Sequence, residues 1–172
     1  TFSRMDRCVV HSSTFGRNNL AMACGLATLH VLEEEQLVAN AARMGALLRQ
    51  RLLALRERHS LIREVRGLGL MLAIEFQQPA EFAARLGWKL IHAVDPALFV
   101  QMIVTRPFSH HRILTHVAAH GRDEIKLLPP LTIGEAEIER FVRALDAVLV
   151  QCRRFPGPIW ELGANYLHQT LR

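Results

Sequence analysis

Two adjacent hydroxyl residues, Ser13 and Thr14, offer the clearest chemistry in this sequence. They belong to the segment HSSTFGRNN, residues 11–19, which leads into a helix predicted over residues 18–34. Two hydroxyls, together with backbone N–H groups exposed by a turn at Gly16, could hold a phosphate at the start of that helix. Because Ser and Thr also cap helices without any ligand, the loop by itself predicts either an anion site or an ordinary cap.

Four histidines lie close together in the sequence: His110, His111, His116 and His120. Imidazoles at such spacing can bind a transition metal. If residues 113–117 form a strand, however, His111 and His116 cannot share a regular face, and no cysteine lies nearby. The cluster therefore predicts histidines at the surface or at the edge of the core, and we expect no metal site.

The composition indicates a soluble globular protein, since 50% of the 172 residues are hydrophobic and 22% are charged. No apolar run approaches the roughly 20 residues of a membrane span, and the first residues lack the pattern of a secretory signal. Three widely spaced cysteines predict reduced thiols rather than a disulfide framework. We therefore expect a cytoplasmic protein with no membrane partner.

The net charge of +5 raises the question of nucleic-acid binding. Many of the arginines, however, lie between residues 43 and 66 and alternate with leucines at helical spacing, which is typical of a solvated helix face opposite a buried one. An aromatic content of 6% also leaves few side chains on which bases could stack. We expect no nucleic-acid partner.

Hydrophobic periodicity predicts a helix-rich α/β chain. The predicted helices cover residues 18–34, 36–59, 79–100 with a break at Asp95-Pro96, and 134–152. Residues 62–76 indicate a strand, a turn and a second strand, and further short strands are predicted over 103–107, 113–117 and 124–128. Small residues in the first helix predict close packing against another backbone.

Three blocks of this sequence resemble class III aminotransferases, the branch of fold-type I pyridoxal-phosphate enzymes that includes ornithine and acetylornithine aminotransferases. The blocks are HSSTFGRNNLAMACGLATLHVLEEE from His11, VRGLGLM over residues 65–71 and IKLLPPLTI over residues 125–133. They occur in the family's order and spacing, and together they cover residues 8 to about 150. The resemblance is specific at the level of the family.

The resemblance implies the C-terminal part of a fold-type I aminotransferase with pyridoxal 5'-phosphate as cofactor. Residues 1–60 would end the large cofactor-binding domain and form a long connecting helix. Residues 61–152 would form the small C-terminal α+β domain, and residues 153–172 a tail. The activity implied for the complete protein is transfer of an amino group from an amine or amino acid to a carbonyl acceptor.

In this family, the lysine that forms the Schiff base with the cofactor lies upstream of the segment that Thr14 matches. This sequence holds two lysines, Lys89 and Lys126, and neither occupies that position. We therefore expect no catalytic residue in this chain, which also begins with Thr1 rather than Met, and we expect it to be inactive alone. The alternative is a truncated, non-catalytic subunit or pseudoenzyme that dimerises with an intact aminotransferase.

The resemblance also assigns roles to individual residues. The family's counterpart of Thr14 binds the cofactor phosphate of the other subunit, so Thr14, and less strongly Ser13, are expected to bind phosphate in a homodimer. Lys126 matches a position where many members carry an arginine that contacts the substrate carboxylate. Lysine keeps the charge but loses the bidentate geometry of a guanidinium, which leaves the amino donor open. An exposed lysine without a ligand is the alternative.

Overall fold

The computed structural model describes residues 14, 16, 18–119, 121–154 and 157. The chain divides into two compact units, Thr1–Val38 and Ala39–Arg172. The boundary of these units lies near the start of the second helix. The expected domain division near residue 60 concerns the complete protein and stays a prediction.

The first unit consists, in its described part, of a turn at Thr14 and Gly16 followed by helix α1 (Asn19–Glu34). Asn18 is the N-cap, and its side-chain Oδ1 accepts a hydrogen bond from the backbone N–H of Ala21 at 3.0 Å. No residue of α1 is buried, and a Cβ added at Gly25 would meet nothing within 4 Å. The close packing predicted from the small residues of α1 therefore has no partner among the described residues of this chain.

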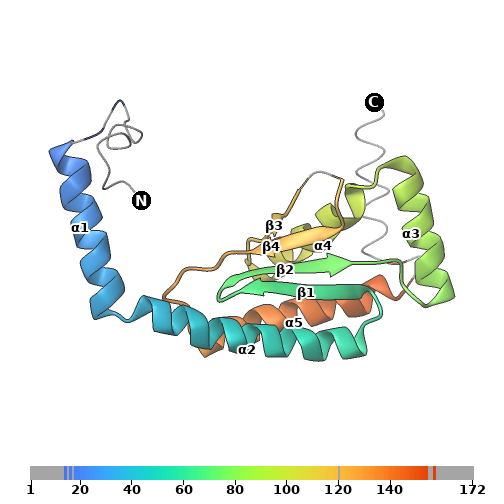
Figure 1. Ribbon diagram of the computed structural model, residues 1–172. Coiled ribbons are helices and arrows are strands. Elements are labelled where there is room, and N and C mark those ends of the chain that lie inside the picture. The colour runs from blue at the N-terminus through green and yellow to red at the C-terminus, as the bar shows by residue number, and fades with distance from the viewer. Residues whose placement is uncertain (1–13, 15, 17, 120, 155–156, 158–172) are drawn as a thin grey trace, which may run out of the picture. The chain divides into compact units, whose positions relative to one another are not determined.

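The second unit is an antiparallel sheet covered on one face by helices (Figure 1). Its strands are β1 (Ile62–Leu68), β2 (Met71–Phe76), β3 (His116–Val117) and β4 (Glu124–Leu127). They lie in the order β1-β2-β4-β3, and every neighbouring pair is antiparallel. Helix α2 (Leu37–Arg58), which begins two residues before this unit, and helix α5 (Glu135–Cys152) run along the same face of the sheet. The remaining helices are α3 (Phe82–Val94) and α4 (Leu98–His111).

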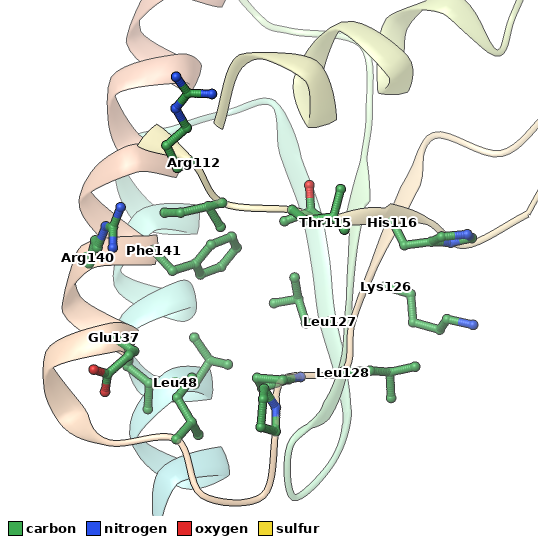
Figure 2. Close-up of a pocket in the computed structure, with 16 residues that line it drawn as sticks. Leu48, Arg112, Thr115, His116, Lys126, Leu127, Leu128, Glu137, Arg140 and Phe141 are labelled. Carbon is green, nitrogen blue, oxygen red and sulfur yellow. The ribbon is translucent and has the colours of Figure 1, made fainter. Parts of the chain in front are cut away.

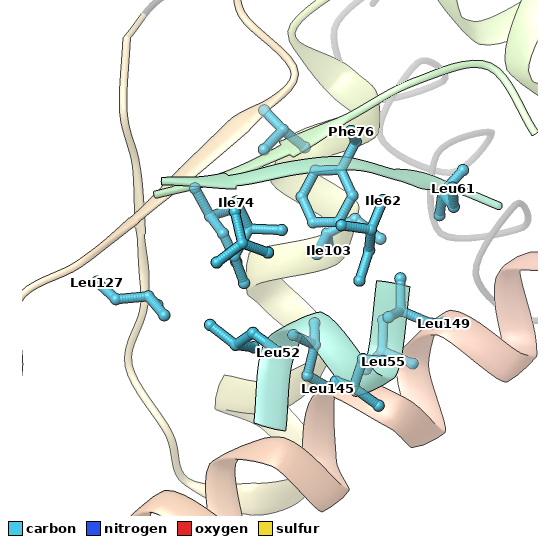
Figure 3. Packing of buried hydrophobic residues seen from close by; sticks show 14 of the residues in the cluster. Leu52, Leu55, Leu61, Ile62, Ile74, Phe76, Ile103, Leu127, Leu145 and Leu149 are labelled. Atoms are coloured by element: carbon cyan, nitrogen blue, oxygen red, sulfur yellow. The ribbon is translucent and has the colours of Figure 1, made fainter. Parts of the chain in front are cut away.

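The core lies between the sheet and the helices (Figure 3). The apolar stripes predicted for α2 and α5 are buried there: Leu52 and Leu55 of α2 and Leu145 and Leu149 of α5 are each at most 1% exposed. They pack below the inward-facing residues of the strands, such as Ile74. Burying such a side chain contributes about 1.5–3 kcal/mol, so these stripes supply much of the energy that holds the layers together.

The tight hairpin between β1 and β2 confirms the predicted strand, turn and strand over residues 62–76. Leu68 pairs with Met71, so only two residues form the turn, and Gly69 at its first position has a φ of 54°. A Cβ added at Gly45 of α2 would lie 2.2 Å from the carbonyl oxygen of Gly69. Glycine at position 45 therefore allows the helix to approach the hairpin backbone directly.

The predicted strand over residues 103–107 is wrong, because these residues belong to helix α4. The run from Leu98 to Ile103 is buried almost throughout, so it shows no polar face from which a helical period could be read. The predicted strand over 113–117 shortens to His116–Val117. The break predicted at Asp95-Pro96 is confirmed, since α3 ends at Val94 and α4 starts at Leu98.

Candidate functional site

Lys126 lies on β4, on the face of the sheet that the helices leave uncovered. Its neighbours Ile125 and Leu127 are buried and point to the core, whereas Lys126 is exposed. Figure 2 shows its side chain extending away from Phe141. No hydrogen bond or ion pair joins the Lys126 ammonium group to any other residue that the structure describes, so this cation is available to an anionic ligand.

The uncovered face of the sheet, which we call the outer face, carries its side chains in rows across the strands. Register pairs Glu64 with Glu75 and Glu75 with Glu124, which forms an acidic row. The next row contains three cationic or basic side chains and one small one, in the order Arg66, Ala73, Lys126 and His116. The predicted substrate-binding lysine thus belongs to a row of positive charge that borders a row of negative charge.

Arg66 joins these two rows. Its guanidinium lies 2.7 Å from the carboxylate of Glu124, 3.1 Å from that of Glu75 and 3.6 Å from that of Glu64. The pKa of Arg66 is raised, chiefly by the charge of Glu124, to which it also donates a hydrogen bond. Arg63 donates a second hydrogen bond to Glu75, at 2.9 Å. Two arginines of β1, Arg63 and Arg66, therefore neutralise most of the negative charge of the acidic row.

A pocket of about 590 Å³ lies beside β4 (Figure 2). Its walls are mostly apolar and come from α2, α5, β3, β4, the segment after α4 and the Pro129-Pro130 turn. Thr115 contributes a buried hydroxyl that has no hydrogen-bond partner among the described residues. Lys126 and His116 are also among its lining residues, so the predicted carboxylate site borders this pocket, although the Lys126 side chain extends away from Phe141.

The predicted phosphate loop belongs to the first unit. Thr14 is exposed in a turn four residues before the N-cap of α1, whereas Ser13 and His11 lie outside the described residues. The first turn of α1 contains no acidic side chain, so the positive end of the helix dipole is not cancelled there. This environment fits a phosphate group, although it also fits an ordinary helix start.

Among the described residues, no group of three or more His, Cys, Asp or Glu side chains is arranged to hold a metal ion. His120 lies outside those residues. Two other histidines contact carboxylates in a way that the sequence did not suggest: the ring of His59 lies 2.6 Å from Asp146 and that of His92 lies 2.8 Å from Asp123. Both pairs are distant in sequence, and no motif marks them.

The fold and the ordered sequence blocks define a class III aminotransferase, and the chain belongs to this family: the model named "Aminotransferase class-III" matches residues 2–149. Aminotransferase PigE of Serratia sp. is 33% identical to it over 186 residues, which cover 90% of this chain and 22% of that protein. Diaminobutyrate–2-oxoglutarate aminotransferase of Rhizobium meliloti is 38% identical over 144 residues, covering 84% of this chain and 30% of that protein.

A solved structure agrees with these relatives. The amine transaminase from an uncultivated Pseudomonas species, in its PLP-bound form, is 31% identical and matches with a TM-score of 0.65 over 88% of this chain and 31% of its own. The chain thus spans less than a third of the length of each of these proteins. The predicted family and α/β fold class are confirmed, and the family implies pyridoxal phosphate as cofactor.

The two lysines of the sequence both belong to the second unit. Lys89 is exposed on α3, and Lys126 is exposed on β4. The described residues therefore include a hydroxyl and a helix start that fit the phosphate of the cofactor, but no lysine in the unit that holds them. Among the described helices, none is long and apolar enough to cross a membrane.

Proposed function

We propose that this chain is the C-terminal portion of a pyridoxal-phosphate-dependent transaminase that moves an amino group from an amine or amino acid to a carbonyl acceptor. The observation that carries the proposal is the family match over residues 2–149 in a chain that spans less than a third of its relatives. The cofactor, when bound, supplies the electron sink for this chemistry. With no lysine available for the Schiff base, the chain alone is inactive and its share of catalysis lies in binding.

Thr14, with Ser13 beside it, is the proposed phosphate-binding group. The exposed Thr14 hydroxyl can donate a hydrogen bond to a phosphate oxygen, and the N-terminus of α1 favours negative charge nearby. In the proposed homodimer this phosphate belongs to the cofactor of the other subunit. Support for the dimer comes from α1, which exposes the large apolar side chains of Leu20, Met22, Leu26 and Leu29.

Lys126 is the proposed ligand for the substrate carboxylate. Its ammonium group is exposed and unpaired among the described residues, and the neighbouring strand places His116 directly opposite it. A lysine binds a carboxylate as a point charge rather than through a planar fork. We propose that Lys126 therefore attracts the carboxylate of an amino acid or a keto acid without fixing its orientation tightly. The cytoplasm is the proposed location.

The test is cofactor binding by the complete protein that carries this chain, with Thr14→Ala compared with Thr28→Ala. Loss of a hydrogen bond to a charged group costs about 1.5–3 kcal/mol, so T14A should weaken binding of pyridoxal phosphate at least about tenfold. Among the described residues, Thr28 donates only to the carbonyl of Cys24 within α1, so T28A should bind as wild type does. Equal affinity of T14A and wild type would remove Thr14 from the site.

The same preparation tests the activity. The complete protein should transfer amino groups to pyruvate or 2-oxoglutarate, whereas the 172-residue chain alone should not. Turnover by the 172-residue chain would contradict the proposal. If the reading frame encodes no upstream region with a Schiff-base lysine, the alternative interpretation as a non-catalytic partner subunit is favoured. In that case the chain should co-purify with a longer aminotransferase.

A further inference from the structure

Two carboxylates of the outer face lie within reach of Lys126. Glu124 precedes Lys126 by two residues on β4, so both side chains point to the same face. Glu75 is its diagonal neighbour on β2, because Lys126 pairs with Ala73. Diagonal neighbours are roughly 7–8 Å apart, a distance that long side chains can bridge. Lys126 nevertheless makes no ion pair with either carboxylate.

Arg66 binds both of these carboxylates. One terminal nitrogen of its guanidinium lies 2.7 Å from Oε2 of Glu124, and the other lies 3.1 Å from Oε2 of Glu75. A guanidinium presents five N–H donors in a fixed plane, so it can serve two carboxylates at once, which the compact ammonium of a lysine does less well. Both carboxylates with which Lys126 could pair are therefore already paired with Arg66, which lies on β1.

We propose that Arg66 is a positioning residue for Lys126: by holding the carboxylates of Glu75 and Glu124, it keeps the Lys126 ammonium free to bind the carboxylate of a ligand. This inference rests on the proposed role of Lys126 in substrate binding. Without Arg66, the two glutamates would pair with Lys126 and compete with the ligand for the same charge.

Burial makes Glu124 the decisive partner. Its side chain is only 10% exposed, so water cannot replace the charge of Arg66 at this carboxylate. Arg63 resembles Arg66 in strand and charge, but its side chain is 63% exposed and, among the residues that the structure describes, pairs with Glu75 alone. Arg63 therefore provides a matched control on the same strand.

The experiment uses the 172-residue chain and glutarate, an unreactive dicarboxylate. The sequence contains only Lys89 and Lys126, so the two lysine Cε–Hε signals in a carbon–proton NMR spectrum are readily assigned, and Lys89 serves as an internal reference. The variants are Arg66→Met, Arg63→Met, Lys126→Met and the double variant Arg66→Met with Glu124→Gln. His116, opposite Lys126, is retained in all of them.

We expect glutarate to shift the Lys126 signal in the wild-type chain and to bind about threefold to fivefold more weakly to R66M, as the strength of an exposed ion pair implies. Adding E124Q to R66M should restore the affinity to within about twofold, and R63M should remain within about twofold of wild type. Unchanged binding by R66M, or failure of E124Q to restore it, would overturn the inference.

A crystal structure of R66M separates the inference from the proposed function. If Arg66 keeps the two glutamates away from Lys126, a carboxylate oxygen of Glu124 or Glu75 should lie within about 4 Å of the Lys126 ammonium group in that variant. This contact would support the role of Arg66 even if glutarate fails to shift the wild-type signal, an outcome that would remove Lys126 from substrate binding. A Lys126 ammonium group that stays apart from both carboxylates in R66M would contradict the inference. If R66M does not fold, Arg66→Lys should give smaller changes in the same directions.

Discussion

At the scale of residues, a hydrogen bond between His59 and Asp146 joins the end of α2 to α5. His59 follows α2 and is 3% exposed, and its Nε2 lies 2.6 Å from Oδ1 of Asp146 on α5. Arg58 donates a hydrogen bond to the other carboxylate oxygen of Asp146 at 3.1 Å. Burial raises the pKa of Asp146, but the hydrogen bond with His59 and the charge of Arg58 outweigh it and lower this pKa below its ordinary value.

A lowered carboxyl pKa in the folded state stabilises the protein above the pKa of the unfolded chain, about 3.9 for Asp, and this stabilisation is lost as the pH falls through the folded-state value. We therefore expect Asp146→Asn to reduce the free energy of unfolding by about 1 kcal/mol at pH 7. Near pH 3 the difference from wild type should shrink. Urea denaturation at both pH values measures it.

The control is Glu139→Gln, also on α5. Glu139 pairs with Arg51 at 2.6 Å, but the two side chains are 36% and 45% exposed, so this pair should contribute less than about 0.5 kcal/mol at either pH. A difference between D146N and wild type that stays constant from pH 7 to pH 3 would show that the charge of Asp146 does not stabilise the fold.

The sequence predicted candidate site residues, but it did not predict the contacts around them. Lys126 was predicted from a family motif, and its exposure on β4 is compatible with that role, which stays a prediction together with those of Thr14 and Ser13. The contacts of Arg66 with Glu75 and Glu124 were missed, because they depend on which strands pair and in which register. The alternation of Glu64 with Arg66 and of Glu124 with Lys126 was the available signal that both pairs point to one face.

At the scale of elements, the contact between α2 and the β1–β2 hairpin depends on glycine. A Cβ at position 45 would lie 2.2–2.7 Å from backbone atoms of Gly69, and a backbone cannot move aside as a flexible side chain can. Gly69 itself has a positive φ, which other residues rarely adopt. Glycine at positions 45 and 69 therefore allows α2 and the β1–β2 turn to pack in close contact.

We expect Gly45→Ala to lower the free energy of unfolding by about 1–3 kcal/mol, the usual cost of overpacking, even though alanine favours a helix by about 1 kcal/mol over glycine. Gly25→Ala in α1 is the matched control, because a Cβ there meets nothing within 4 Å. G25A should leave the unfolding midpoint unchanged or raise it. Urea denaturation followed by circular dichroism compares them, and a G45A chain as stable as wild type would contradict the clash.

Helices with a clear period of hydrophobic residues were predicted well, whereas the helix without such a period was not. The helix predicted over 36–59 is α2 and the one over 134–152 is α5, within one residue at each end, because each alternates a buried stripe with a solvated face. The second half of helix α4 was wrongly predicted as a strand. Phe99, Val100 and Ile103 are all fully buried, and a helix that is apolar on most sides resembles a buried strand in sequence.

At the scale of the whole molecule, the two units differ in how they are stabilised. In the described part of the chain, the hydrophobic core cluster begins at Met44 and lies within the second unit, whereas no residue of α1 is buried. The first unit instead exposes large apolar side chains on α1, which is unusual for a helix that has only water as a neighbour. The second unit therefore has the means to fold by itself, and the first has a surface suited to association.

We expect a shortened chain of residues 37–172, which keeps α2 complete, to unfold cooperatively with a free energy within about 1 kcal/mol of the 172-residue chain, since the deleted residues of α1 bury little apolar surface among the described residues. If α1 mediates the proposed homodimer, sedimentation equilibrium should show association of the 172-residue chain and a monomeric shortened chain. Urea denaturation must be repeated at several protein concentrations, because dimerisation makes stability depend on concentration. A shortened chain that fails to fold would contradict the independence of the second unit, and one that still dimerises would place the contact outside α1.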